Sequence, residues 1–151
     1  MNRSTAREIA VHFAFELAFS DEKAQQLLDR ELTEESFAQR SREEPMYAGF
    51  PDEGELNYIT RLVLGVGGHG AELDGYIAKY AKGWKFYRID RVASAIMRVT
   101  MYEIMYMPDI PNKVAINEAV EIAKSYLDDE VVKFINGILG SFVRSELPEQ
   151  E

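Results

Sequence analysis

Apolar residues recur at three- and four-residue intervals along most of the chain, which is the spacing of one face of an α-helix. The pattern is clearest near the C-terminus, where apolar side chains fall at i, i+3, i+4, i+7, i+8 and i+11: Val131, Phe134, Ile135, Ile138, Leu139 and Phe142. No run of alternating apolar and polar residues is long enough to predict a strand. The sequence therefore predicts an all-α fold, a two-lobed bundle of about six or seven helices.

The boundaries of these helices follow from caps and breakers. We expect helices over residues 5–17, 21–32, 56–83, 90–106, 117–126 and 131–142. Thr5 and Glu8 have the spacing of a capping box, and Asn117 is a predicted N-cap. Residues 33–39 extend the second helix or form another turn. Residues 40–55 contain two prolines and two glycines without a helical period, which predicts a loop that is mobile or carries a partner contact.

Three glycines in the long central helix, Gly65, Gly67 and Gly70, satisfy the spacing of a dinucleotide-binding motif. That motif requires a preceding strand and further β-α alternation, and neither is predicted here. The helical period continues through the glycines. We therefore interpret them as small residues that let a neighbouring helix approach closely.

The residue types needed for common catalytic and metal sites are scarce. The chain of 151 residues has no cysteine and two histidines, His12 and His69, which excludes thiolate sites and histidine-rich zinc sites. Each histidine is interpreted as a residue at the edge of the core. Glu118 and Glu121 lie three residues apart, but Glu121 also has the spacing to pair with Lys124. The sequence predicts no enzyme, no cofactor and no metal.

The charge is uneven along the chain. In total, 26 acidic and 17 basic residues give a net charge of −9, which by itself argues against nucleic-acid binding. Residues 20–60 hold four basic against eleven acidic residues, a net charge of −7, whereas residues 79–98 hold six basic residues against one acid, a net charge of +5. The second segment also contains four aromatic residues, Tyr80, Trp84, Phe86 and Tyr87. It either binds nucleic acid by phosphate neutralisation and base stacking or forms a corner of the bundle.

The sequence predicts no membrane anchor, because it has no uncharged stretch of sufficient length. The longest uncharged stretch in the middle of the chain, residues 62–71, is about half the ~20 residues that a spanning helix needs. Charged residues also interrupt the N-terminal apolar stretch where a signal peptide would lie. We expect a cytoplasmic protein.

The C-terminal half carries specific motifs: RVTMYE at residues 98–103, DIP at 109–111, KVAINEAVEIAK at 113–124 and KFINGIL at 133–139. In order and spacing they resemble the NusB family of bacterial transcription antitermination factors. The ARE at residues 6–8 resembles the opening of that family, and Trp84 precedes an arginine-led helix as it does there. The resemblance spans nearly the whole chain and implies a single domain of two helical lobes, about 1–82 and 83–151.

The resemblance also implies a function. NusB-like proteins pair with NusE, a small-subunit ribosomal protein, and hold the boxA element of single-stranded RNA within the RNA polymerase antitermination complex during ribosomal RNA synthesis. Carried over to this chain, the RNA-binding residues are Arg3, Arg7, Tyr126, Glu130, Lys133 and Phe134. The residues that contact NusE are Phe15, Asp90 and Arg91.

Three questions stay open from the sequence. Phe134 belongs both to the proposed RNA surface and to the apolar stripe of the last helix. The acidic balance and the sparse N-terminal arginines also suit a helical protein-interaction adaptor that does not recognise RNA. Family members are seen as monomers or dimers, so a homodimer is open as well.

Overall fold

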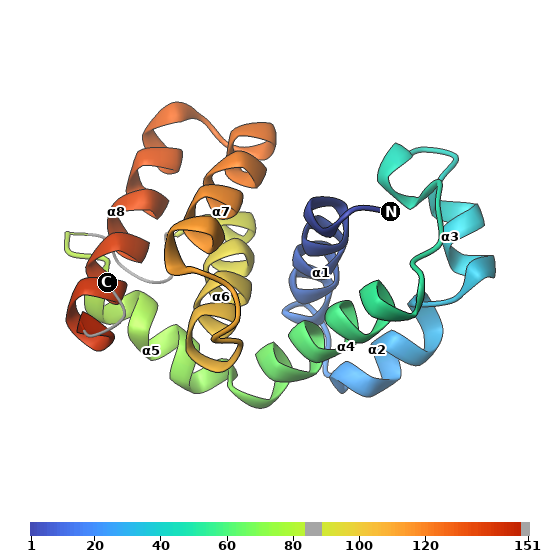
Figure 1. Cartoon of the computed structure of the whole chain (residues 1–151), viewed down its shortest axis with the longest axis horizontal. Helices are drawn as coiled ribbons and strands as arrows, with labels where there is room; N and C mark the ends of the chain where they lie inside the picture. Colours follow the sequence, from blue (N-terminus) through green and yellow to red (C-terminus); the bar gives the residue numbers. More distant parts are fainter. Residues whose placement is uncertain (84–88, 149–151) are drawn as a thin grey trace. The chain divides into compact units, whose positions relative to one another are not determined.

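A computed structural model describes residues 1–83 and 89–148 of the chain (Figure 1). These residues form helices and no strand, so the predicted all-α class is confirmed. They contain eight α-helices and one short 3-10 helix, more than the six or seven predicted. The chain divides into two compact units, Met1–Gly68 and His69–Glu151.

The first unit contains α1 (Arg3–Leu17), α2 (Ala24–Glu31), α3 (Glu34–Arg40), the 3-10 helix η1 (Pro45–Tyr47) and α4 (Glu53–Gly68). Its core joins the apolar face of α1 to that of α4, and α2 also packs on α4. The largest side chains with almost no exposure are Phe13, Phe37, Tyr47, Ile9, Leu27, Ile59 and Leu62.

The first helix starts earlier than the capping-box pattern predicts. The N-cap is Asn2, whose side-chain Oδ1 accepts a hydrogen bond from the Thr5 amide at 2.8 Å. Asparagine is as good an N-cap as serine or threonine. Helix α1 therefore begins at Arg3, and the Thr5 prediction was wrong.

The predicted loop at residues 40–55 is partly helical and anchored in the core. Tyr47 of η1 is 1% exposed, and its ring lies 5.0 Å from that of Phe37 in an edge-on arrangement. Phe50 packs on the other side of Phe37 at 5.1 Å. Buried aromatic side chains hold this segment without a long apolar period, so the sequence pattern did not reveal it.

The second unit contains α5 (Gly70–Tyr80), α6 (Arg91–Tyr106), α7 (Asn112–Tyr126) and α8 (Asp129–Glu146). Helix α6 contacts the other three and is the most buried element of the unit, which explains its many small and apolar residues (Figure 1). Helix α7 begins at Asn112 directly after Pro111, so the start at residue 117 and the Asn117 cap predicted there were wrong.

The predicted helix over residues 56–83 is two helices. His69 leaves the helical conformation, with φ −119° and ψ 19°, and separates α4 from α5. The His69 ring lies 4.5 Å from the ring of Tyr106 and 5.6 Å from that of Tyr102, both on α6. The apolar residues keep their helical spacing across the break, because His69 is the one residue between the two helices. The sequence placed the lobe boundary near residue 82, whereas the compact units divide at His69, since α5 packs on α6 and α8.

The glycine motif is helical on both sides of a break at His69, whereas an unbroken helix was expected. Gly65 and Gly67 belong to α4, and a Cβ added at Gly67 would lie 2.8 Å from Cβ of Ala24 on α2. Such a contact is shorter than carbon atoms tolerate, so Gly67 is required for the close approach of α2 and α4. At Gly70 an added Cβ would meet nothing within 4 Å. Close packing is thus confirmed at one position of the motif.

Candidate nucleic-acid interface

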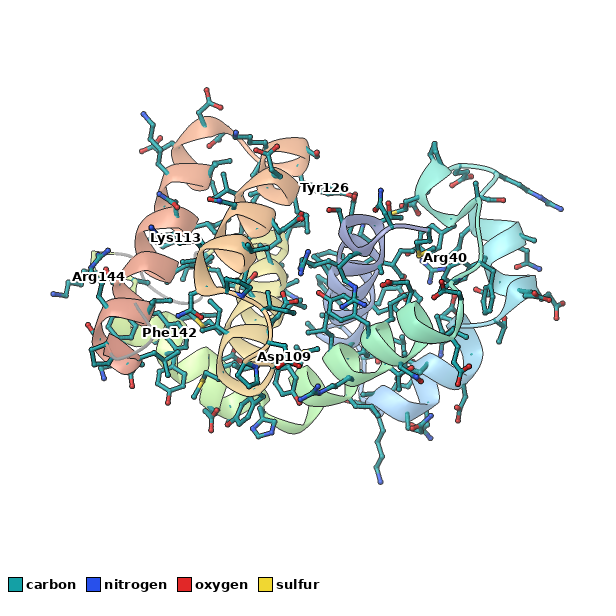
Figure 2. The ribbon with its side chains drawn as sticks, viewed as in Figure 1. Arg40, Asp109, Lys113, Tyr126, Phe142 and Arg144 are labelled. Atoms are coloured by element: carbon teal, nitrogen blue, oxygen red, sulfur yellow. The ribbon has the colours of Figure 1, made fainter. Side chains whose placement is uncertain are left out.

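Four of the residues predicted to bind RNA lie at the turn between α7 and α8. Tyr126 is the last residue of α7 and is 41% exposed (Figure 2). Glu130 and Lys133 are exposed on the first turns of α8, and Phe134 is half-buried. The structure therefore brings these four residues to the same end of one helix pair.

Local sequence explains the tightness of this turn. Helix α7 ends where Leu127 adopts an extended conformation, with φ −131° and ψ 158°. Asp128 then caps α8, because its side chain accepts a hydrogen bond from the Val131 amide at 3.0 Å. Two residues thus separate the helices, and Asp129 and Glu130 in the first turn suit the positive end of the helix dipole.

The chemistry of this surface suits an unpaired nucleic-acid strand. Lys133 forms no ion pair with another residue in the described part of the chain, so its ammonium group is available to a phosphate. Tyr126 offers an exposed aromatic ring, on which a base can stack. The Glu130 carboxylate can accept hydrogen bonds from the amino group of a base.

The two predicted N-terminal arginines lie together in the first unit. The Arg3 guanidinium lies 3.9 Å from the centroid of the Tyr58 ring, and its Nε donates to Glu55 Oε2 at 2.9 Å. Arg7 approaches the same ring at 5.6 Å but is 2% exposed. Of the two, Arg3 keeps a solvent-accessible side chain, 47% exposed, which a ligand can reach.

The residues predicted to contact a protein partner fall in both units. Phe15 on α1 is half-buried and packs edge-on against Phe19, which is 54% exposed, with ring centroids 4.8 Å apart. In the second unit Asp90 caps α6, accepting hydrogen bonds from the amides of Val92 and Ala93 at 2.7 and 3.2 Å. Arg91 follows it and is exposed.

The basic segment at residues 79–98 is described in part. Trp84, Phe86 and Tyr87 lie outside the described residues. Within the described part of this segment, Lys79 pairs with Glu146 at 2.7 Å and Arg98 with Asp74 at 2.5 Å. These pairs link α5 to α8 and to α6, so part of the segment's charge stabilises the bundle.

The sequence did not reveal a polar cluster around Arg40 in the first unit (Figure 2). Arg40 Nη2 lies 2.6 Å from Glu16 Oε1 and 2.8 Å from Glu31 Oε1, and the guanidinium also lies over the Tyr47 ring. Burial raises the pKa of Glu31, but hydrogen bonds from Arg30, Ser36 and Arg40 outweigh it and lower that pKa to about 2. No spacing rule joins Glu16, Glu31 and Arg40, because they come from three separate helices.

Both histidines occupy boundary positions, as predicted. His12 Nδ1 lies 3.4 Å from Glu44, and burial lowers the pKa of its imidazole. His69 stacks on the tyrosines of α6. Within residues 1–83 and 89–148 no group of three or more acidic or histidine side chains could hold a metal ion. Lys124 pairs with Glu121 at 3.1 Å, in agreement with the prediction of a solvated helix face.

Comparison with known proteins identifies relatives over almost the whole length. The sequence pattern of the NusB family matches residues 4–144. The transcription antitermination protein NusB of Acetivibrio thermocellus is 38% identical over 147 residues, covering 97% of this chain and 92% of that protein. NusB of Clostridium kluyveri is 34% identical and covers 97% of both chains. A solved structure of T. maritima NusB superposes with a TM-score of 0.79 at 27% identity, covering 96% of this chain and 92% of that one. In the described part of the chain, every helix is too short or too polar to cross a membrane.

Proposed function

The chain belongs to the NusB family of transcription antitermination proteins, and from this we propose that it is a non-enzymatic RNA-binding factor that pairs with NusE on boxA RNA. The observation that carries the proposal is the turn between α7 and α8. It presents an exposed tyrosine, Tyr126, and a lysine, Lys133, that forms no ion pair within residues 1–83 and 89–148. The match to the NusB family over residues 4–144 includes this turn and supports the proposal.

In the proposed mechanism, RNA is bound by electrostatic contacts to its phosphates and by stacking on its bases. Lys133 and Arg3 neutralise phosphates, and Tyr126 and Phe134 stack on bases. Because Arg3 already contacts Glu55 and the whole chain is acidic, affinity for RNA alone is expected to be weak. NusE, bound through Phe15, Asp90 and Arg91, supplies the remaining affinity.

The proposal is tested by titrating labelled boxA RNA with the protein, with and without NusE, at two salt concentrations. Fluorescence anisotropy should show weak binding alone, tighter binding with NusE, and affinity that falls as salt rises. A scrambled RNA of equal length is the control. Absence of RNA binding in the presence of NusE would contradict the proposal.

A charge reversal at Lys133 tests the assigned surface. Lys133→Glu should weaken RNA binding by about fivefold or more, because repulsion replaces a phosphate contact. The matched control is Arg42→Glu, the same change of charge at an exposed position of the first unit. Equal affinities of the two variants would remove Lys133 from the RNA surface.

A second candidate function is that of a protein-interaction adaptor. The burial of Arg7 and the pairing of Arg3 with Glu55 favour it, since both reduce the positive charge available near the N-terminus. The same titration distinguishes the RNA-binding factor from the adaptor. NusE binding that persists while RNA adds nothing supports the adaptor.

A further inference from the structure

A cavity lies between the C-terminal ends of α5 and α8 in the second unit. Its volume is about 420 Å³, and it is lined by Lys79, Tyr80, Lys82, Ser141 and Ser145. Neither the family match nor the residues carried over from the resemblance assign a role to this cavity. Its lining of ammonium and hydroxyl groups is suited to an anion with several oxygen atoms.

The local sequence opens this cavity. Helix α5 ends at Tyr80, and Gly83 adopts a positive φ of 82°, a conformation that side chains disfavour. The turn between them carries Lys82. On α8, Ser141 and Ser145 are four residues apart and therefore share one side of the helix. Their short side chains leave the space between the two helices unfilled.

The positive charge at the cavity exceeds the negative charge among the described residues. Glu146 accepts hydrogen bonds from Lys79 and from the Tyr80 hydroxyl, so Lys79 is largely neutralised. Lys82 forms no ion pair with any other described residue. Arg144 lies next to the lining residue Ser141, because its Nη2 donates to Ser141 Oγ at 3.3 Å. Two cations, Lys82 and Arg144, are therefore available to an anion.

The cavity lies on the same helix as the proposed RNA surface. Lys133, Gly137, Ser141 and Arg144 are spaced by four, four and three residues and form one face of α8. A side chain at Gly137 would meet open space, so nothing obstructs the middle of this face. From Lys133 to Ser145 the distance along the helix is about 18 Å at 1.5 Å per residue.

We propose that this cavity binds a phosphodiester group of the same RNA strand, flanking the boxA bases that contact the α7–α8 turn. The inference rests on the proposed function. It extends the RNA path along α8 and assigns Lys82, Arg144, Ser141 and Ser145 as phosphate contacts. The cavity is expected to contribute modestly to the affinity for RNA, because the C-terminal end of α8 carries the negative pole of the helix dipole.

The test compares boxA RNA with boxA RNA extended by about four nucleotides at either end, which is the lower end of the sites of single-strand-binding modules. Binding is measured in the presence of NusE. For the unchanged protein, one of the extensions should tighten binding by about threefold to tenfold. In the double variant Lys82→Gln, Arg144→Gln this gain should disappear, whereas the affinity for unextended boxA RNA should stay the same.

Two controls make the result specific. Arg42→Gln removes one exposed positive charge in the first unit and should keep the gain. An extension of abasic nucleotides should keep the gain, and one with uncharged methylphosphonate linkages should lose it, since the cavity contacts phosphate. Circular dichroism of the double variant verifies that the helices are intact.

The outcomes separate this proposal from the one it rests on. Normal binding of boxA RNA with no gain from either extension overturns the phosphate site and leaves the proposed function standing. A gain that persists in the double variant, or with methylphosphonate linkages, also overturns it. A complete lack of RNA binding by the unchanged protein with NusE overturns both.

Discussion

In the unit Met1–Gly68, arginines lie in ion pairs with acids of the same unit: Arg3 with Glu55, Arg30 with Glu22 and Glu31, and Arg40 with Glu16 and Glu31. In the unit His69–Glu151, Lys82 and Lys133 form no ion pair among the described residues. The first unit also has the more negative net charge of the two. Ion pairs occur in both units, since Lys79 pairs with Glu146 and Arg98 with Asp74 in the second. The difference is that the three arginines above compensate acids of the first unit, whereas Lys82 and Lys133 are available to a ligand.

This comparison refines what the net charge of −9 means. A total charge describes the whole chain, whereas a phosphate responds to the charges within about 8–10 Å. Where acids and arginines are already paired, removing an arginine affects stability. Where a lysine is unpaired, removing it affects ligand binding. The following predictions separate these two effects.

The largest effect is expected from the apolar core of the second unit. Phe142 is fully buried and packs on the rings of Tyr76 and Tyr80 at 5.1 and 6.3 Å. Phe142→Ala should lower the free energy of unfolding by about 3–5 kcal/mol, whereas Phe142→Leu should lower it by less than ~2 kcal/mol. Urea denaturation gives the size, and hydrogen exchange should show the loss of protection in α5 and α8. A loss below about 1 kcal/mol for Phe142→Ala would contradict this packing.

The next effect concerns the ion pairs of the first unit. Arg40→Met keeps much of the side-chain volume but leaves Glu16 without its cation and Glu31 with Arg30 alone, so we expect a loss of about 2–3 kcal/mol. The control Arg42→Met changes an exposed residue and should alter the free energy of unfolding by less than ~0.5 kcal/mol. Equal losses in the two variants would show that the Arg40 cluster does not stabilise the unit.

Acid should weaken the same cluster. The pKa of Glu31 in the folded chain is about 2, below its ordinary value of 4.5, so the folded state binds its proton less readily than the unfolded state does. This contribution to stability is present above pH 4.5 and is lost as the pH falls towards 2. Urea midpoints should therefore fall over this range, and fall less in Arg40→Met. Carbon-13 NMR of the Glu31 carboxyl group measures the pKa directly; a midpoint near 4.5 would refute the prediction.

The smallest effect on stability is expected at Lys133. Lys133→Gln should change the free energy of unfolding by less than ~0.5 kcal/mol, because no ion pair within the described chain is lost. The same variant should weaken RNA binding. A large loss of stability would mean that Lys133 supports the fold, and the contrast between the two units would fail at this residue.

The class of fold was predictable because apolar residues at helical spacing lie on one face of a helix, which is the face that becomes buried. The pattern of α8 held from Val131 to Phe142, and Lys133 was correctly expected on a helix. What failed depended on contacts between distant residues. The ring of His69 packs on α6, and Tyr47 is buried beside Phe37; neither contact leaves a local signal in the sequence.

The candidate site was predictable to a similar degree. The resemblance selected residues that lie together at the α7–α8 turn, because that motif is contiguous in the sequence. It gave no indication that Arg7 is 2% exposed or that Asp90 caps α6, since both depend on the surrounding structure. The cavity at Lys82 and Ser141 joins two helices far apart in the chain, and no motif covers it.

The close approach of α2 and α4 has a consequence for how the sequence can change over time. Because a methyl group at Gly67 would lie 2.8 Å from the methyl group of Ala24, the crossing has room for one methyl group and not for two. Alanine at one position thus restricts the other to glycine. Across homologous sequences the two positions should vary together, and an exchange of the two residues should be tolerated where either enlargement alone is not.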